Sequence, residues 1–331
     1  MCRTRYIGVC WIGRRNPMAD ISAFANRLRK NARHWSKWAR RNDISCYRLY
    51  DRDVPEFPFV IDIYGDQLHL QEVDTGWQIG DDDYITWLAT VSAAAAEVLQ
   101  LPDEAIHLKQ RRRQKGLEQY EKAGEQGEEF VVEEGGLKFG INLDQYLDVG
   151  LFLDHRNTRA MVRAEAAGKR FLNLFAYTGS FTVYAAHGGA TSSVTVDMSN
   201  TYQAWTQRNL ELNGLAGPQH RLQRADVFRY LEDAETAGER FDLIVMDPPT
   251  FSNSSKMQGV LDVQRDHVWL VAQCMTLLAP GGTLYFSNNL RSFELDEYLT
   301  EIHRVEEISH LTVPEDYRNK KIHRCWKIRH L

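Results

Sequence analysis

The first third of the chain shows short helical and strand patterns. Apolar side chains from Ile21 to Trp38 recur at intervals of three and four residues, which predicts an amphipathic helix over residues 20–41. A second helix is expected over residues 84–99, and Pro102 marks its end. Runs rich in β-branched and aromatic residues predict strands at 45–50, 59–64, 68–73 and 106–109. These elements predict a small α+β domain over residues 18–127, preceded by a poorly ordered extension, 1–17.

A polar stretch separates this region from the rest of the chain. Residues 110–129 contain Gly116, Gly124 and Gly127 and read as a mobile loop or linker. Apolar runs at 130–132 and 137–143 then flank Gly135 and Gly136, which predicts a hairpin. We take this hairpin as the start of a second domain over residues 128–331.

From Arg170 onward, strand and helix patterns alternate. Strands are expected at 171–175, 193–197, 221–224, 243–246 and 283–287, with helices between them at 181–187, 202–212, 227–235 and 260–278. This alternation predicts βαβ units and a doubly wound, Rossmann-like α/β sheet with helices on both faces. A last pair of strands at 306–310 and 323–328 brings the sheet to seven strands, mostly parallel, and the loop around Pro314 favours an antiparallel final strand.

Composition fits two globular domains and shows an uneven charge. The chain has 331 residues, of which 43% are hydrophobic and 26% charged, so disordered and fibrous classes are excluded. The net charge of −5 conceals twelve Lys and Arg against two Asp in the first 50 residues, a local charge of +10. A basic head on an acidic body indicates a polyanionic partner.

The cysteines and the N-terminus indicate a reducing compartment. Five cysteines without a CxxC pair argue against a disulfide framework and against a metal site. The apolar run at 6–12 is too short to span a membrane, and Arg14 and Arg15 stand where a signal peptidase would need small residues. We expect a cytoplasmic protein.

Candidate chemistry gathers where the predicted strands end. Ligands of doubly wound sheets bind at the carboxyl ends of the strands. The first strand runs into small residues that let the backbone approach a ligand, and the next three strands end in acidic residues: Ala176, Thr178, Gly179, Ser180, Asp197, Asp226 and Asp247. Taken singly, these are more often a tight turn or helix N-caps. Their combination favours a bound nucleoside.

The type of nucleoside follows from the turn. Nicotinamide cofactors need a GxGxxG phosphate cradle, and here only Gly179 is present. S-adenosylmethionine (SAM), which has a ribose and an adenine but no phosphate, fits better. Asp197 would accept hydrogen bonds from the ribose diol, and Asp226 from the adenine amino group. The corner of Asp247, Pro248 and Pro249 would then offer a carbonyl to an extruded planar base, with Phe251 as a stacking platform unless it is a core aromatic.

Several segments resemble one family. They are YLDVGLFLDHRNTR (146–159), FLNLFAYTGSFT (171–182), SVTVDMS (193–199), DPPTFSNS (247–254), DVQRDH (262–267) and FSNN (286–289). In combination they resemble the RlmK-type 23S rRNA guanine-N7 methyltransferases, class I SAM-dependent enzymes related to the rRNA cytosine-C5 methyltransferases. The resemblance runs from about Phe24 to HRCWKI near the C-terminus. Such a domain often forms the C-terminal half of a fusion whose first half makes N2-methylguanine.

The resemblance implies a set of SAM contacts. The turn would contribute Asn173, Phe175, Ala176, Tyr177, Thr178, Gly179 and Ser180. Asp197 would bind the ribose, with Met198 beside the adenine and Asp226 and Val227 at its edge; Asp247 would also reach the cofactor. Phe152, Asp154 and Arg156 would close over the methionine end. Arg156 either pairs with the methionine carboxylate or is a solvent-exposed helix residue.

The predicted strand ends carry no cysteine, and this narrows the choice of the base that is methylated. Methylation of cytosine C5 needs a cysteine that adds to the ring, whereas Cys274 lies in a predicted helix and Cys325 in the last strand. Guanine N7 already has a lone pair. Our hypothesis is that Asp247 accepts from the guanine N1/N2 edge while Phe251 stacks and Asn288 and Asn289 orient the base or the loop. Guanine N2 is the alternative acceptor, and a SAM-binding assembly chaperone the alternative role.

Basic stretches indicate where RNA would bind. The candidates are Arg29, Arg33 and Lys37 in the first helix, Arg111, Arg112 and Arg113 in the linker, and a third stretch at 318–329. Trp35, Trp38 and Tyr47 would either stack bases or form the buried stripe of the helix. The expected partner is 23S rRNA or a large-subunit precursor. Because the first half of the fusion is not in this sequence, docking would depend on these residues or on a separate N2-guanine methyltransferase partner.

Overall fold

The structure, a computed structural model, describes residues 20–76, 80–111, 127–146, 148–252 and 260–331. The expected extension at 1–17 and most of the expected linker at 110–129 lie outside these residues. The domain boundaries that we drew at 18 and 128 stay predictions. No helix in the described ranges is long and apolar enough to cross a membrane.

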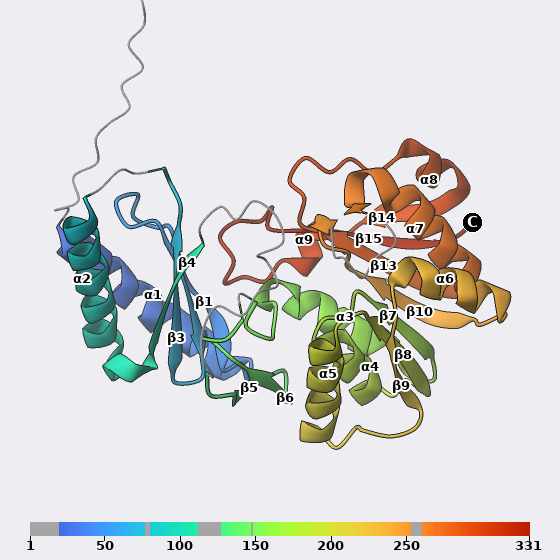
Figure 1. Cartoon of the computed structure of the whole chain (residues 1–331), viewed down its shortest axis with the longest axis horizontal. Helices are drawn as coiled ribbons and strands as arrows, with labels where there is room; N and C mark the ends of the chain where they lie inside the picture. Colours follow the sequence, from blue (N-terminus) through green and yellow to red (C-terminus); the bar gives the residue numbers. More distant parts are fainter. Residues whose placement is uncertain (1–19, 77–79, 112–126, 147, 253–259) are drawn as a thin grey trace, which may run out of the picture.

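Four strands and two helices form the N-terminal domain (Figure 1). They are α1 (Ile21–Arg41), β1 (Cys46–Asp51), β2 (Phe59–Tyr64), β3 (Gln67–Val73), α2 (Asp81–Leu99) and β4 (Ile106–Arg111). The sheet order is β1-β2-β3-β4, antiparallel except for β3 and β4, which α2 connects in parallel. Asp20 caps α1 by accepting the Ser22 N–H, and the apolar side of the helix, with Phe24 and Leu28, packs into the core of this domain.

The second domain contains the seven-stranded sheet. Its parallel part comprises β7 (Arg170–Leu174), β8 (Ser192–Asp197), β9 (His220–Arg224), β10 (Phe241–Met246) and β13 (Leu278–Asn288). At one edge lie β14 (His303–Glu307) and β15 (Arg324–His330), and β15 is antiparallel to β13 as expected. The fold class is therefore confirmed as a Rossmann-like sheet beside a smaller α+β domain.

Helices cover both faces of this sheet (Figure 1). One face carries α6 (Val227–Thr236), α7 (Val263–Leu277) and α8 (Glu297–Ile302), and the other carries α3 (Arg156–Glu165), α4 (Ser180–His187) and α5 (Asn200–Leu212). The hairpin of β5 (Phe130–Glu134) and β6 (Leu137–Ile141) packs on α4 and α5, and β11 (Phe251–Ser252) pairs with β12 (Leu261–Asp262).

One predicted strand is displaced. We expected residues 306–310, but β14 ends at Glu307 and Ser309 begins the short helix α9 (Ser309–Thr312). Ile308 is buried among α3, α4 and β15, and its N–H donates to the Cys325 carbonyl at 2.8 Å. The burial and the hydrogen bond of Ile308 end the alternating pattern of buried and exposed residues, so the strand stops before this residue. The helices α8 and α9 were not among the predicted elements.

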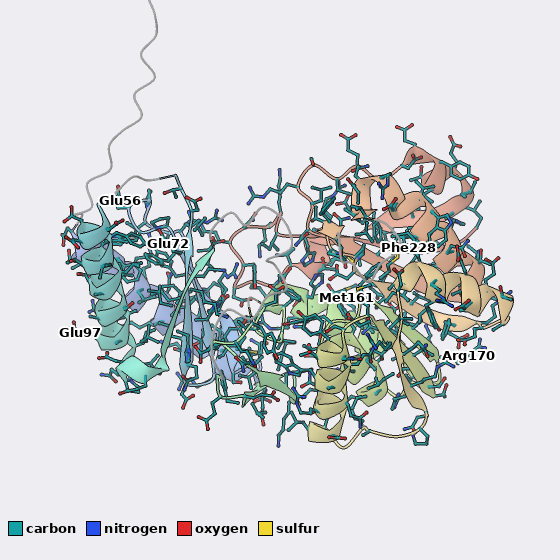
Figure 2. All side chains as sticks on the ribbon, in the orientation of Figure 1. Glu56, Glu72, Glu97, Met161, Arg170 and Phe228 are labelled. Carbon is teal, nitrogen blue, oxygen red and sulfur yellow. The ribbon has the colours of Figure 1, made fainter. Side chains whose placement is uncertain are left out.

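The strand order places a ligand site at one edge of the sheet. The strand order is β14-β15-β13-β10-β7-β8-β9. After β7 the chain adds β8 and β9 on one side and then crosses to add β10 and β13 on the other, so the strand order switches between β7 and β10. Ligands of such sheets bind at the carboxyl ends of the strands at this switch. Arg170, which begins β7, lies on the side of the sheet farthest from the N-terminal domain (Figure 2). The carboxyl ends therefore face the N-terminal domain.

Candidate active site

The loop after β7 has an unusual backbone. Phe175, Tyr177 and Gly179 have φ angles of 54°, 51° and 72°. Residues other than glycine rarely adopt this conformation, and it persists where the surroundings enforce it, often at functional sites. Here the Ala176 N–H donates to the Val196 carbonyl at 3.1 Å, which pins the loop to the next strand. The loop thus presents a fixed backbone at the expected place.

Close packing also requires Gly179. A Cβ on Gly179 would lie 2.3 Å from Cγ2 of Thr206 on α5. The half-buried Ser180 begins α4 directly after it. The Thr178 hydroxyl donates to the Gly150 carbonyl at 2.6 Å. The loop is thereby held between α5 and the segment that leads into α3.

Asp197 closes β8 and faces the same loop. Its Oδ2 accepts the Tyr177 N–H and its Oδ1 accepts the Ser199 N–H, both at 2.9 Å. Burial raises the pKa of Asp197 to about 6, although these two N–H groups act in the opposite direction. Each carboxylate oxygen has a second lone pair. When ionised, Asp197 can therefore accept two ribose hydroxyls in addition to the backbone.

At the end of β9, Asp226 caps α6. Its Oδ1 accepts the Phe228 N–H at 2.8 Å, so the helix-cap role considered for it is present. A carboxylate has further lone pairs for a second partner, and the adenine contact stays a prediction. Met198 is half-buried, and Val227 is buried in the core between α6 and the sheet.

The side chain of Asn173 is used inside the sheet. Its amide donates to the Thr182 hydroxyl at 3.0 Å, and Thr182 shares a hydrogen bond of 2.8 Å with Thr195. Asn173 is buried, and it secures the first turn of α4 beneath the loop. The cofactor contact expected of Asn173 stays a prediction.

The segment before α3 lies against the same loop. Phe152 is 42% exposed, and its ring lies on that of Tyr177 with 5.2 Å between centroids. The Tyr177 hydroxyl donates to the Asp148 carbonyl at 2.6 Å. Asp154 Oδ2 accepts from His323 Nδ1 at 2.8 Å, and the contact of Asp154 with the methionine end stays a prediction. Phe152 thus lies against the loop after β7, and its expected role in closing over the methionine end stays a prediction.

Both interpretations of Arg156 are wrong. Its guanidinium donates to Glu134 at 3.1 Å, to Asp316 at 2.8 Å and to the Cys46 carbonyl at 2.7 Å. The side chain is buried, so it is neither exposed to solvent nor free for a methionine carboxylate. Glu134 and Asp316 are themselves buried, and a buried carboxylate needs a cation. Arg156 satisfies this need where β1, β5 and α3 meet.

The Asp-Pro-Pro corner follows β10. The Ser287 hydroxyl donates to Asp247 Oδ1 at 2.6 Å, and His155 Nε2 lies 3.4 Å from Asp247 Oδ2. Pro248 is buried, whereas Phe251 is 50% exposed. Phe251 is thus not a core aromatic. The corner combines a restrained carboxylate with an exposed aromatic ring four residues later.

Two asparagines at the end of β13 border this corner. Asn288 is buried; its Oδ1 accepts the Leu290 N–H at 3.1 Å, and its Nδ2 has no hydrogen-bond partner among the described residues. A buried donor without a partner is costly and rare in native proteins, which makes Asn288 a candidate for a ligand contact. Asn289 Oδ1 accepts the Thr250 hydroxyl at 2.6 Å and so holds the Asp-Pro-Pro loop.

Two histidines at this corner were missed by sequence reasoning. The rings of His155 and His323 stack with 4.3 Å between centroids and an angle of 8°. His155 could have been noticed beside Asp154 in LDHR, but His323 comes from the loop before β15, distant in the sequence. Only the fold brings the two together.

The cysteines in the described ranges are buried and free. Cys325 lies closer to the corner than we expected, because β15 pairs it with Ser287. Burial, followed by the charge of Asp247, raises the pKa of Cys325, and burial likewise raises that of Cys274. A buried protonated thiol is a poor nucleophile. Neither cysteine suits covalent addition to a base.

A basic stripe runs along the solvent-facing side of α1. It borders a hollow of about 440 Å³ lined by Asn26, Arg29, Lys30, Arg33, His34, Lys37 and Arg41. Trp35, Trp38 and Tyr47 instead pack in the N-terminal core, so they form the buried stripe. Arg111 ends β4, and Arg112 and Arg113 lie outside the described residues.

Three of the six basic residues in the third stretch form ion pairs within the protein. Arg324 contacts Glu307 at 2.8 Å, Arg318 contacts Asp53 at 3.3 Å, and Lys327 forms an ion pair with Glu165. Paired side chains have less to offer a phosphate backbone. The charge of this stretch is therefore partly neutralised by neighbouring carboxylates, and its contact with RNA stays a prediction.

Known proteins match the chain over most of its length. A family model described as S-adenosylmethionine-dependent methyltransferase matches residues 86–320. Ribosomal RNA large subunit methyltransferase K of Neisseria meningitidis serogroup B is 62% identical over 317 residues, which is 96% of this chain and 90% of that protein. The chain belongs to this K-type family of SAM-dependent methyltransferases. The predicted family and the predicted cofactor are thus confirmed.

Longer relatives and a solved structure agree with this family. Ribosomal RNA large subunit methyltransferase K/L of Marinobacter nauticus is 51% identical over 306 residues, and the K/L protein of Stutzerimonas stutzeri is 52% identical. Each alignment covers 92% of this chain but only 42% of the longer protein. A putative methyltransferase solved in complex with SAH superposes with a TM-score of 0.76 at 25% identity, covering 93% of this chain and 81% of that one. The roles of single residues in the K-type methyltransferase stay predictions.

Proposed function

We propose that this K-type methyltransferase methylates N7 of a guanine in 23S rRNA, by extruding the base and transferring the methyl group without a covalent enzyme intermediate. Large-subunit rRNA as the substrate is carried over from the names of the K and K/L relatives. The choice of atom rests on the Asp-Pro-Pro corner. The observation that carries it is the restrained Asp247 carboxylate next to the exposed Phe251.

The cofactor would be held along three strand ends. When bound, SAM supplies an electrophilic methyl group. Asp197 would accept the ribose hydroxyls, and Asp226 the adenine amino group. The backbone of residues 175–180 passes beneath, fixed by its positive φ angles and by the contact of Gly179 with α5. The Nδ2 of Asn288, which the described residues leave unpaired, is a further donor for a ligand at this edge.

Asp247 and Phe251 would receive the base. Phe251 offers a ring face on which an extruded guanine can stack, and Asp247 can accept hydrogen bonds from the N1 and N2 groups. This pairing selects guanine, because cytosine and adenine present no adjacent pair of donors on that edge. Methylation at N7 leaves a positive charge on the purine. A nearby carboxylate stabilises that charge as it develops.

This reaction needs no side chain that acts as an acid, a base or a nucleophile. The N7 lone pair attacks directly, and the protein has to hold it in line at roughly 3–3.5 Å and exclude water. The buried, protonated state of Cys325 agrees with a route that uses no thiol. Methylation at N2, by contrast, would have to release a proton.

The basic stripe on α1 would dock the RNA. Arg33 and Lys37 are exposed, and Arg29 is half-buried and donates to Asn26 at 2.9 Å. Phosphate contacts of this kind position an RNA without reading its sequence. Either naked 23S rRNA or a precursor particle would meet this surface, with or without a separate N2-guanine methyltransferase.

Nucleoside mass spectrometry tests the proposal. Purified protein is incubated with labelled SAM and protein-free 23S rRNA, and the digested RNA is analysed. We expect label in N7-methylguanosine. Label in N2-methylguanosine or 5-methylcytidine would overturn the choice of atom. Unmodified RNA, together with normal ribosome assembly by an Asp197→Ala variant that no longer binds SAM, would favour the chaperone role.

A further inference from the structure

His155 lies between two carboxylates. Its Nε2 is 3.4 Å from Oδ2 of Asp247 and 3.8 Å from Oδ2 of Asp154. The ring is buried, and its other nitrogen, Nδ1, has no hydrogen-bond partner among the described residues. The side chain thus presents Nε2 to two negative groups, and its ring makes an edge contact with that of Phe181 at 5.8 Å between centroids.

This arrangement determines which nitrogen carries the proton. Burial lowers the pKa of His155 more than the neighbouring Asp247 raises it, so the ring is neutral. A neutral imidazole has one N–H and one lone pair. A lone pair on Nε2 would face two carboxylate oxygens. The proton therefore belongs on Nε2, with the lone pair on Nδ1.

The far side of His155 is held by a second buried pair. His323 Nδ1 donates to Asp154 Oδ2 at 2.8 Å, and His323 Nε2 is 3.0 Å from the Thr312 hydroxyl. The ring of His323 stacks on that of His155. This fixes the ring plane of His155 and directs its Nε2 toward the Asp-Pro-Pro corner.

A metal ion is the other ligand that this cluster brings to mind. The candidate atoms of Asp154, His155 and His323 lie within 4.8 Å of one another. A metal, however, binds close to the plane of each imidazole. The two rings are stacked and within 8° of parallel, so no point lies in both planes. The geometry favours hydrogen bonds.

We propose that His155 is a positioning residue for methyl transfer: its Nε2–H holds Oδ2 of Asp247, and the Asp154–His323 pair holds His155. With the Ser287 hydroxyl on Oδ1 at 2.6 Å, both oxygens of Asp247 are then restrained. The separation of 3.4 Å to Oδ2 is long for a hydrogen bond, and such contacts tighten when substrate binds. The inference rests on the proposed function in that Asp247 meets the target base.

Two substitutions separate positioning from simple packing. In His155→Gln the amide nitrogen can reach the position of Nε2, whereas in His155→Asn it reaches only that of Nδ1. A displacement of about 1 Å at a reacting group can lower the rate up to about 100-fold. We expect His155→Asn to lower kcat roughly 10- to 100-fold, with KM for RNA and Kd for SAM little changed. His155→Gln should recover most of the rate.

His220→Asn is the matched control. His220 is also buried, and its Nδ1 shares a hydrogen bond of 2.9 Å with Ser193 Oγ. It begins β9, at the end of the sheet away from the corner. Its substitution should leave kcat unchanged. Equal rates for His155→Asn and the wild type, or equal losses for the Gln and Asn variants, would overturn the proposal.

Nitrogen-15 NMR of the wild type measures the protonation of the two ring nitrogens of His155 and does not depend on the folding of a variant. In protein labelled at histidine, His155 should show a protonated Nε2 and an unprotonated Nδ1 at about pH 7.5, above the usual histidine range. The opposite tautomer would contradict the proposal.

The comparison of the Gln and Asn variants does not depend on which atom is methylated, because the rates can be compared for whichever methylated nucleoside the wild type makes. If that product is not N7-methylguanosine, the proposed function fails while the comparison of Gln with Asn remains valid.

Discussion

Arg156 on α3 and Asp316 in the loop before β15 form a buried ion pair, with 2.8 Å between Nη1 and Oδ1. Asp316 Oδ2 also accepts the Arg48 N–H of β1 at 2.9 Å, and Arg156 reaches the Cys46 carbonyl in the same strand. The pair therefore joins the N-terminal domain to the catalytic sheet. It helps to hold the N-terminal domain, which carries the basic stripe, against the domain that carries the candidate active site.

Loss of this pair should destabilise the protein. Arg156→Gln leaves the buried Asp316 carboxylate without its cation, which costs about 3–5 kcal/mol, whereas Glu134 keeps its pair with Arg159 at 2.7 Å. Arg170→Gln is the control: Arg170 pairs with Asp242 at 2.9 Å, but its side chain is 46% exposed, and such pairs contribute about 0–1 kcal/mol. Urea unfolding measures both. A stable Arg156→Gln variant that has lost SAM affinity would instead restore Arg156 as a cofactor ligand.

SAM binding should weaken in acid because of Asp197. The ionised carboxylate accepts the ribose hydroxyls, and burial raises its pKa to about 6. The ionised fraction, and with it the affinity, should be constant well above pH 6 and fall as the pH drops through 6. Isothermal titration calorimetry on both sides of this pKa would show the change. Asp197→Asn should bind SAM weakly at every pH. A wild-type affinity that does not change over this range would exclude Asp197 from ribose binding.

Gly179→Ala should disturb the cofactor loop in two ways, through backbone strain and through a clash of the new Cβ with α5. Forcing an alanine into the left-handed region costs about 1–2 kcal/mol, and here its Cβ would also meet Thr206 at 2.3 Å. Gly238 has a φ of 69°, and a Cβ added there would have nothing within 4 Å, so Gly238→Ala reports strain alone. We expect SAM affinity to fall at least tenfold for Gly179→Ala and to stay unchanged for Gly238→Ala. Equal behaviour of the two would show that the packing of the loop is not needed.

Charge reversal on α1 should weaken RNA binding. Arg29→Glu combined with Arg33→Glu removes phosphate contacts, and each lost contact reduces the salt slope of binding by about 0.7–0.9. SAM affinity should not change. Arg229→Glu with Arg240→Glu gives the same change of charge near α6, remote from α1 (Figure 1). If both double variants flatten the slope equally, α1 has no special part in docking.

Much of the fold follows from local patterns. The strand 59–64 is found as expected, and the alternation after Arg170 gives the parallel sheet because each βα unit has its own periodicity and turn. The error at 306–310 arose where a tertiary contact, the burial of Ile308, ended the strand. A pattern of polarity does not contain such a contact.

The site was predictable where it follows strands and not where it depends on pairing. The positions of Asp197 and Asp247 could be predicted because one ends β8 and the other directly follows β10, and these strands meet at one edge; their roles stay predictions. Arg156 was misassigned because its partners, Glu134 and Asp316, are distant in the sequence. His323 was missed for the same reason. Both errors concern buried polar networks, in which the role of each residue is set by partners that only the fold reveals.

The choice of N7 is tested most directly by changing that atom. Once the product has been mapped to a nucleotide, an RNA fragment can carry 7-deazaguanosine there, which replaces N7 by a C–H group and keeps the N2 amine. A second fragment can carry inosine, which keeps N7 and lacks that amine. We predict that the 7-deazaguanosine fragment binds but accepts no methyl group, whereas the inosine fragment is methylated, with weaker binding of the base at Asp247. Methylation of the 7-deazaguanosine fragment and none of the inosine fragment would contradict the account and identify N2 as the acceptor.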